Sequence, residues 1–258
     1  MPLKFRANVE ADILSFAYVP DYKIPYLNAT IGFSVYEFFA NVRAEAAVNV
    51  FGRIQNPAVQ KAGFGDLTVV PLFLGFDFPS VNLHAVVAPF DFTAPTGRYS
   101  RSDPIGNNTG LNFWSYRPAL ALTYLNKTGQ ELTLNMGYSI NTQNDATKYK
   151  SGNEFYFTYV AQQFVNPVLG LNIGGYYSIQ TTNDTVNGRA VFSSNSPSAA
   201  PDLLNAGVGN RGEVFAIGPG ILYNPTPKIF LNAHWDHEIF SYNKQQREQV
   251  YARVAFRF

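Results

Sequence analysis

The sequence has no cysteine, few charged residues and no long apolar run, and each of these absences narrows its class. Without cysteine there can be no disulfides, thiolate metal ligands or cysteine nucleophiles. Charged residues form 14% of the 258 residues, against about 25% in soluble domains. The net charge of +1 gives no basic footprint for nucleic acid. The longest apolar run, Leu67–Phe76, falls short of the roughly 18 residues that a membrane-spanning helix needs.

Aromatic residues are abundant by contrast, at 16% of the chain, with 22 Phe and 16 Tyr. Yet the mean hydropathy is only −0.10, so uncharged polar residues must dilute the apolar ones. A chain whose strands are apolar on one face and polar on the other has this mixture.

Apolar and polar residues alternate with a period of two from one end of the chain to the other, which predicts β-strands. No segment fits a helical period better. The predicted strands number eleven, near residues 4–18, 24–40, 64–78, 81–93, 111–125, 130–142, 153–165, 168–181, 212–223, 228–241 and 247–258.

The connections between these strands alternate in length. Short turns are expected at 20–25, 79–80, 126–129, 166–167 and 224–227, and longer polar loops at 43–62, 94–110, 142–152, 182–211 and 242–246. Short periplasmic turns and long extracellular loops are typical of outer-membrane barrels. The sequence therefore predicts an all-β fold: one antiparallel transmembrane β-barrel domain over residues 1–258, in the bacterial outer membrane. A soluble β-sandwich is the alternative, although it would seldom sort its loops in this way.

Eleven strands conflict with the even numbers of bacterial single-chain barrels. If 20–25 is a periplasmic turn, an upward strand should precede the first predicted one. We therefore expect about twelve strands, with an opening strand and a signal peptide upstream of residue 1. The alternative is that Val42–Val50, which also alternates, supplies the missing strand.

Aromatic residues recur at the predicted strand ends, as the interface girdles of barrels do. They are Tyr18, Tyr26, Phe78, Tyr124, Phe164 and Tyr223 at the periplasmic rim and Trp114, Phe155, Tyr177 and Phe215 at the outer rim. The terminal Phe258 closes an alternating strand, which resembles the signal read by the bacterial barrel-assembly machinery.

The polar faces of the strands carry charges of both signs, which we expect to line the pore and to pair across it. They are Arg6, Glu10, Asp12, Arg117, Glu131, Glu154, His234, Asp236, Glu238, Arg253 and Arg257. The same pairs could also serve only to fill the barrel.

Two segments break the polar-inside pattern, because Leu67–Phe76 and Val81–Phe90 are largely apolar on both faces. One side of the lumen should therefore be apolar. Pro71, Pro118 and Pro219 fall near the middle of strands, where a proline donates no ladder hydrogen bond. They are either harmless bulges or points where the wall is weakened, through which an apolar solute could leave sideways.

Enzyme motifs are weak in this chain. Residues 207–212 fit a GxGxxG pattern, but a strand rather than a helix follows the loop, so a loop end is the better interpretation. His234, Asp236 and Glu238 share a strand face without a neighbouring serine nucleophile, which favours pore lining over catalysis or cation binding. His84 is interpreted as a satisfied lumen residue. We expect no enzyme activity, no cofactor and no metal site.

Several sequence blocks resemble a family of proteobacterial outer-membrane channels associated with the meta pathway of phenol degradation. The blocks lie in order along nearly the whole chain at 63–69, 94–99, 112–116, 151–155, 174–177, 210–212 and 216–219. The resemblance implies a 12-stranded barrel that takes up small, often aromatic or hydrophobic compounds, and it implies no catalytic residues. Family members carry a signal peptide and an opening strand before the equivalent of Lys4, and this chain departs from them there.

The combined interpretation is a monomeric outer-membrane channel for passive uptake of small hydrophobic or monoaromatic molecules. Its partners would be outer-membrane lipid, lipopolysaccharide and the assembly machinery, and not nucleic acid. A twelve-stranded frame predicts a narrow pore, because eight strands are filled by side chains and 16–18 leave a water channel. A general small-solute or ion pore, a structural barrel without transport, and a membrane-embedded hydrolase are the alternatives.

Overall fold

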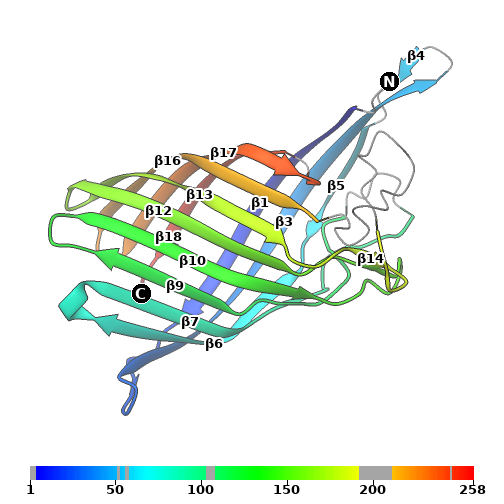
Figure 1. The fold of residues 1–258 in the computed structure, drawn as a ribbon. Coiled ribbons are helices and arrows are strands. Elements are labelled where there is room, and N and C mark those ends of the chain that lie inside the picture. Colours follow the sequence, from blue (N-terminus) through cyan, green and yellow to red (C-terminus); the bar gives the residue numbers. More distant parts are fainter. Residues whose placement is uncertain (1–3, 51–52, 56–57, 103–107, 192–210, 245) are drawn as a thin grey trace.

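The computed structural model describes residues 4–50, 53–55, 58–102, 108–191, 211–244 and 246–258, and nearly all of its regular structure is antiparallel β (Figure 1). The all-β prediction is confirmed. The strands are β1 (Lys4–Tyr18), β2 (Lys23–Ile24), β3 (Ala29–Val50), β4 (Arg53–Gln55), β5 (Ala58–Phe64), β6 (Leu67–Phe78), β7 (Leu83–Ala94), β8 (Ser115–Tyr116), β9 (Ala119–Leu125), β10 (Gln130–Asn141), β11 (Tyr149–Lys150), β12 (Glu154–Asn166), β13 (Leu169–Gln180), β14 (Thr185–Val186), β15 (Arg189–Ala190), β16 (Glu213–Thr226), β17 (Ile229–Tyr242) and β18 (Glu248–Phe256). Among the described residues the helical element is the 3-10 turn Pro79–Val81, and no helix there is long and apolar enough to cross a membrane.

One large sheet contains the long strands, in the order β1-β3-β6-β7-β8-β10-β12-β13-β16-β17-β18, and it curls back on itself in Figure 1. We call each strand position in this order a stave. Two of the staves are interrupted and consist of two shorter strands each. β5 and β6 both pair with β3 and are separated by Gly65 and Asp66, and β8 and β9 both pair with β7 and β10 and are separated by Arg117 and Pro118.

The connections differ at the two ends of the sheet, as the sequence predicts. At the short-turn end tight turns join the staves, for example the one between β12, which ends at Asn166, and β13, which begins at Leu169. At the opposite, long-loop end the connections are longer, and β11, β14 and β15 form a separate small sheet within them. Of the predicted loop 182–211, residues 192–210 lie outside the described part, as does most of the motif at 207–212.

The segment predicted as a loop at 43–62 is instead largely strand. β3 runs unbroken to Val50, so Val42–Val50 is its far half and not a separate stave. β5 pairs with residues 39–45 of β3, beyond the level at which β7 ends opposite Leu67. The part of β3 from Phe39 onward, the part of β1 up to Asp12 that pairs with it, and β5 project beyond the other staves, at the upper right of Figure 1. We call this part of the sheet the wing.

The burial pattern is inverted relative to a water-soluble protein. The buried apolar side chains of the described residues are small: Ala29, Ala40, Val70, Ala85, Val214 and Ala216. Buried polar side chains outnumber them, and many Phe, Tyr, Leu and Ile side chains are exposed. Large exposed apolar surfaces mark contact with a membrane or with another protein.

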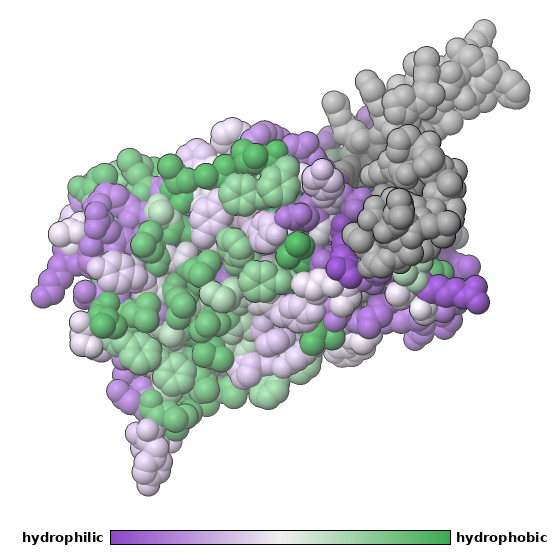
Figure 2. Space-filling view, viewed as in Figure 1, coloured by the Kyte–Doolittle hydropathy of each residue, from purple (hydrophilic) through white to green (hydrophobic). Residues whose placement is uncertain are grey.

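Figure 2 shows hydrophobic residues gathered over the middle of the visible staves and hydrophilic ones toward the two ends. The expected aromatic positions Tyr18, Phe78, Tyr124, Tyr223 and Trp114 are exposed. Phe164 differs, because it lies opposite Gly170 on the same face as the buried Gln162.

The outermost staves of the sheet are β1 and β18, and no ladder joins them within the described residues. Both are exposed along most of their length. The path of the sheet contains eleven described staves, and the twelfth strand stays a prediction.

Candidate functional site

The inner face of the curled sheet can be identified from one polar cluster. The Arg117 guanidinium donates to the Tyr36 hydroxyl at 2.6 Å and lies 3.1 Å from the Asp91 carboxylate, so residues from β3, β7 and the β8–β9 break meet there. The Arg117 guanidinium also donates to the Thr68 hydroxyl at 3.4 Å, and Thr68 shares a 2.9 Å hydrogen bond with the Thr93 hydroxyl. Paired residues of antiparallel strands share a face, so the strand register assigns every other position from this cluster.

The middle of the inner face of β6, β7 and β9, between the Arg117 cluster and the His84–Asp77 pair, is apolar, and we call this part the apolar wall. The register places six residues there: Val70, Phe73, Val86, Ala88, Ala119 and Ala121. The Phe73 ring lies over Gly32 of β3, where a Cβ atom would come within 2.3 Å of it. Val86 is 38% exposed although it faces inward, so its side chain borders open space. Four of these six residues fall in the two segments for which the sequence predicts an apolar side of the lumen, 67–76 and 81–90.

Prolines interrupt the hydrogen-bond ladder of this wall in three neighbouring staves. The β6–β7 register shifts between Val69 and Leu72, around Pro71. The next stave breaks at Pro118, and Pro89 lies between the two, with its carbonyl accepting from the Tyr116 hydroxyl at 2.7 Å. We call Pro71, Pro89 and Pro118 the proline row. Pro219 differs, because the β16–β17 register is the same on its two sides.

The Arg117 cluster lies on the inner face at the level of this row. The Arg117 backbone N–H donates to the Asp91 carbonyl at 2.8 Å, while its side chain pairs with the Asp91 carboxylate. Side-chain bonds therefore join staves where the backbone ladder is incomplete. Only Arg117 was expected here from the sequence.

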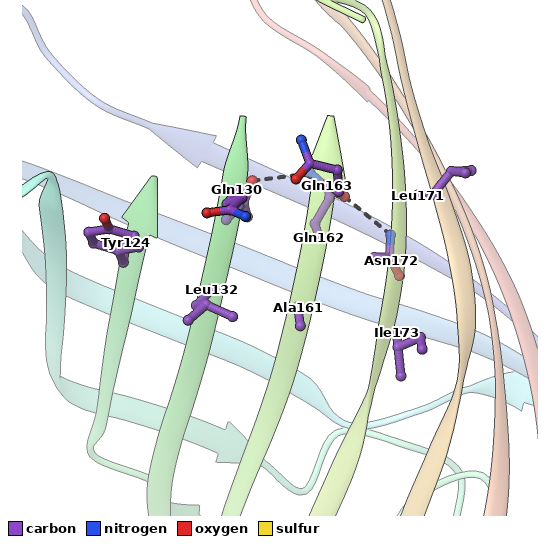
Figure 3. Close-up of a pocket in the computed structure, with 10 residues that line it drawn as sticks. Tyr124, Gln130, Leu132, Ala161, Gln162, Gln163, Leu171, Asn172 and Ile173 are labelled. Atoms are coloured by element: carbon purple, nitrogen blue, oxygen red, sulfur yellow. Dashed lines mark hydrogen bonds between the residues drawn. The ribbon is translucent and has the colours of Figure 1, made fainter. Parts of the chain in front are cut away.

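The opposite part of the sheet, β12, β13, β16 and β17, has a buried polar inner face, and we call it the polar wall. Gln162 links its neighbours: its Nε2 donates to Glu131 of β10 at 3.1 Å and its Oε1 accepts from Asn172 at 3.2 Å (Figure 3). The row continues to His234, whose Nδ1 is 3.3 Å from Asp236, and whose ring stacks on Tyr251 at 5.6 Å. His234 and Asp236 are each 4% exposed.

Glycines on the inner face give this polar row its space. A Cβ at Gly220 would lie 2.4 Å from the Asn172 Oδ1 atom and 2.3 Å from the His234 ring. A Cβ at Gly174 would lie 3.2 Å from the Nε2 atom of the same ring. In the polar wall the Asn172 amide and the His234 imidazole therefore pack directly against the backbone at glycine positions.

At the long-loop end of the polar wall, acidic side chains hold the last connection. Glu238 is buried and accepts from the Tyr176 hydroxyl at 2.6 Å and from the Arg247 backbone N–H at 2.7 Å. Glu154 pairs with Lys244, which also donates to Ser178 at 2.8 Å. Within the described residues no group of three His, Asp or Glu side chains is placed to hold a metal ion.

The predicted pore-lining residues of β1 are not on the inner face. Glu10 pairs with Asn41 and Asp12 with Phe39, on the face opposite to that of Tyr36. The reason is their position in the wing, beyond the level where β7 ends, where polar residues can face outward into water. Arg6 has the same parity, but its side chain lies outside the described residues.

The remaining predicted charges fall at the edge stave. Arg253 lies opposite Asn232 and so shares the inner face of the His234 row. Arg257 follows the end of β18, and its backbone N–H donates to the Lys228 carbonyl at 2.8 Å. His84 faces inward at the short-turn end and bonds Asp77 at 2.7 Å.

Buried carboxylates fix the loops at the long-loop end. Above the apolar wall, Asp66 is 3% exposed and accepts the backbone N–H groups of Gly97 and Leu111 at 2.8 and 2.7 Å. Gly97 and Gly110 pack so closely that a Cβ on either would come within 2.7 Å of the other. Asp66 therefore holds both described ends of the connection after β7.

Asp184 has the same role above the polar wall. It is 3% exposed and accepts from the Gly152 backbone N–H at 2.7 Å, the Gln180 amide at 2.7 Å and the Tyr149 hydroxyl at 2.6 Å. Burial, and then the hydrogen bond to Asp184, raise the pKa of the Tyr149 phenol above its usual 10.0.

These loop anchors were missed as site residues by the sequence reasoning. Asp66 and Gly97 lie within blocks that carry the family resemblance, and so does Gly152. The blocks therefore coincide in part with a belt of side-chain-to-backbone hydrogen bonds at the bases of the loops. The position of these residues within the family-like blocks was the signal that could have identified them.

A family described as "Putative MetA-pathway of phenol degradation" matches the chain over residues 1–254. The chain belongs to this family. The family assignment agrees with the resemblance carried by the sequence blocks. No curated protein matches the chain.

Among solved structures, the chain is similar to an outer-membrane channel from Pseudomonas putida F1. The TM-score is 0.69 at 18% sequence identity, over 97% of this chain and 85% of that one. This likeness establishes the fold alone: the chain has the same antiparallel β architecture as that protein.

Proposed function

We propose that the protein is an outer-membrane channel that passively takes up small hydrophobic solutes, monoaromatic compounds in particular, and that it is not an enzyme. The observation that carries the proposal is the apolar wall, where Val70, Phe73 and Val86 face inward opposite a polar wall. A polar solute would be better served by a lumen that is polar all round. The family description, which names phenol degradation, points to the same solute class.

The long-loop end would face the outside and the short-turn end the periplasm. A solute would enter beneath the loops that Asp66 and Asp184 hold, and then follow the apolar wall. Leaving water for such a surface is worth about 25 cal/mol per Å². The proline row, with its incomplete ladder, would be the place for sideways exit, and Pro219 is the weaker candidate because the register around it is unchanged.

The inner charges would let few ions pass. Arg117 is paired with Asp91 and Lys244 with Glu154, so charges of opposite sign neutralise each other locally. We propose small single-channel currents with weak ion selectivity. The protein would act as a monomer among outer-membrane lipids and lipopolysaccharide, inserted by the assembly machinery through Phe258.

A structural barrel without transport is the second candidate, and one observation favours it. His234, Asp236 and Glu238 are only 3–4% exposed, so the polar wall is packed against other groups rather than open to water. Planar-bilayer recording of the purified protein separates the two candidates, because a sealed barrel gives no channel events.

The uptake test is growth of an outer-membrane-limited strain on a monoaromatic carbon source. Val86→Lys would place a charge in the apolar path and should slow aromatic uptake several-fold while ion currents persist. Val86→Leu keeps the position apolar and is the matched control. If Val86→Lys and a deletion of the gene both left aromatic uptake unchanged, a general small-solute pore would be the better account.

A further inference from the structure

Two adjoining hollows lie on the outer face of β9, β10, β12 and β13. Their volumes are about 610 and 270 Å³, and they share Tyr124, Leu132 and Ala161. The strand register places Leu132, Ala161 and Ile173 side by side, on the face opposite to the Glu131–Gln162–Asn172 row (Figure 3). We call the two hollows together the outer groove. The larger hollow alone has the size of a small-molecule site.

The groove exists because one residue in a row of larger apolar side chains is small. Ala161 is the small residue in a row where its cross-strand neighbours are Leu132 and Ile173. Leu134 and Tyr159 line the groove toward the middle of the staves, and Leu171 lines it nearer the short-turn end. The floor is thus lower than the walls on both sides.

The length of the groove matches one leaflet of a bilayer. It runs along β10 from Gln130 to Leu134. Four residues of a strand tilted by about 40° rise roughly 10 Å, which is close to half of the apolar band about 25 Å tall on outer-membrane barrels. The groove therefore spans the leaflet at the short-turn end and stops near the middle of the membrane.

The rim of the groove is polar at the short-turn end. The Gln163 amide donates to the Thr128 carbonyl at 3.0 Å, and the Gln130 amide accepts from Asn126 at 2.8 Å, so both are fixed to the turn 126–129. Lys127, which is exposed, lies in that same turn. The Gln163 amide nitrogen also donates to the Phe164 carbonyl at 2.9 Å, so both of its N–H groups are used, and the donors that we assign to a phosphate at this rim are the Gln130 amide and the Lys127 ammonium group.

We propose that the outer groove binds one phospholipid of the periplasmic leaflet, with an acyl chain over Ala161 and its phosphate beside Lys127. The proposal rests on the proposed membrane location and orientation, and not on what the channel transports. A lipopolysaccharide chain of the opposite leaflet would not reach the groove, because the groove ends near the membrane centre.

The test is native mass spectrometry of the full chain, titrated with phosphatidylglycerol in a non-ionic detergent. Ala161→Leu fills the floor and should abolish the bound-lipid peak. Its matched control is Ala233→Leu, at an outward position opposite Ile221 on β17 and β16, which should bind as the unaltered protein does. Lys127→Glu should weaken binding about five-fold or more, and Lys228→Glu, in another short turn, should not.

Equal binding by Ala161→Leu and the unaltered protein would overturn the proposal, as would equal loss in Ala161→Leu and Ala233→Leu. Folding of each variant is checked by its heat-dependent shift in gel mobility, so a misfolded variant is not counted as a lost site. Bilayer conductance is measured on the same samples. A protein that binds lipid but gives no current would contradict the proposed channel and leave this site standing.

Discussion

The apolar wall and the polar wall differ in how their neighbouring strands are held together. In the apolar wall the backbone ladder is broken at the proline row, and the Arg117 cluster joins the staves by side chains. In the polar wall the β12–β13 register runs unbroken to Phe164, although the β16–β17 register shifts between Phe215 and Ala216, and inner side chains lie over glycines. At the proline row, side-chain bonds join strands whose backbone ladder is incomplete, whereas between β12 and β13 the ladder needs no such support.

The ion pairs of the two walls should therefore differ in importance, and this is the largest effect that we expect. Arg117→Met leaves the Asp91 carboxylate, whose side chain is only 12% exposed, without its partner, which should cost about 3 kcal/mol of unfolding free energy. Lys244→Met breaks the pair of the polar wall, whose side chains are 28% and 27% exposed, and should cost about 1 kcal/mol.

Urea unfolding followed by gel mobility measures both costs. The double variant Arg117→Met with Asp91→Leu should recover part of the loss, because no unpaired buried charge remains. A double variant that is as unstable as the sum of its single variants would mean that the pair does not act as a unit.

The second largest expected effect is a difference between the two walls in the stability cost of replacing a glycine by alanine. A Cβ at Gly218 of the polar wall would lie 1.6 Å from the Trp235 carbonyl oxygen, so Gly218→Ala should destabilise the fold by about 1–3 kcal/mol. At Gly75 of the apolar wall the nearest atom would be Thr30 Cβ at 3.5 Å, an ordinary contact. Gly75→Ala should therefore change stability by less than about 0.5 kcal/mol. Similar costs at the two positions would show that the walls are equally tight.

Hydrogen exchange tests the broken ladder directly. Amides beside the proline row, such as that of Phe90, should exchange about fivefold faster than those of Ile173 and Tyr177, because a ladder bond contributes about 1 kcal/mol. Mass spectrometry of peptides from the folded protein resolves the two regions. Uniform protection across both walls would remove the physical basis for sideways exit at the row.

The smallest effect concerns the loop anchors at high pH. Asp66 accepts from backbone amides that do not titrate in this range, whereas Asp184 also accepts from the Tyr149 phenol, whose pKa is raised. A raised pKa means that the stabilisation is complete below about pH 10, the unfolded value, and is lost as the pH rises through the folded one. Proteolysis near residues 142–153 should therefore increase in strongly alkaline buffer, while 95–102 stays protected. Tyr149→Phe should abolish that alkaline dependence, and cleavage that rises equally in both segments would contradict it.

The sequence allowed the strand pattern to be predicted because one face of each stave meets apolar surroundings and the other does not. The strand register puts Glu131 on the same face as Gln162, and Asp236 on the same face as His234. The alternation failed at Glu10 and Asp12, because in the wing it no longer marks the inside. It could not reveal Asp66 or Asp184, since a carboxylate that caps backbone N–H groups from a loop leaves no periodic signal.

The two tryptophans lie in different parts of the fold, which makes the protein its own optical probe. Trp114 lies at the base of a loop, where its backbone N–H donates to Thr142 at 2.9 Å, and it is 52% exposed. Trp235 is 44% exposed, and its indole donates to Glu248 at 3.0 Å across the β17–β18 pair. Since the chain has two tryptophans, replacing either one by phenylalanine leaves a single emitter. One variant then reports by fluorescence on the loop base and the other on the edge stave, without any added label.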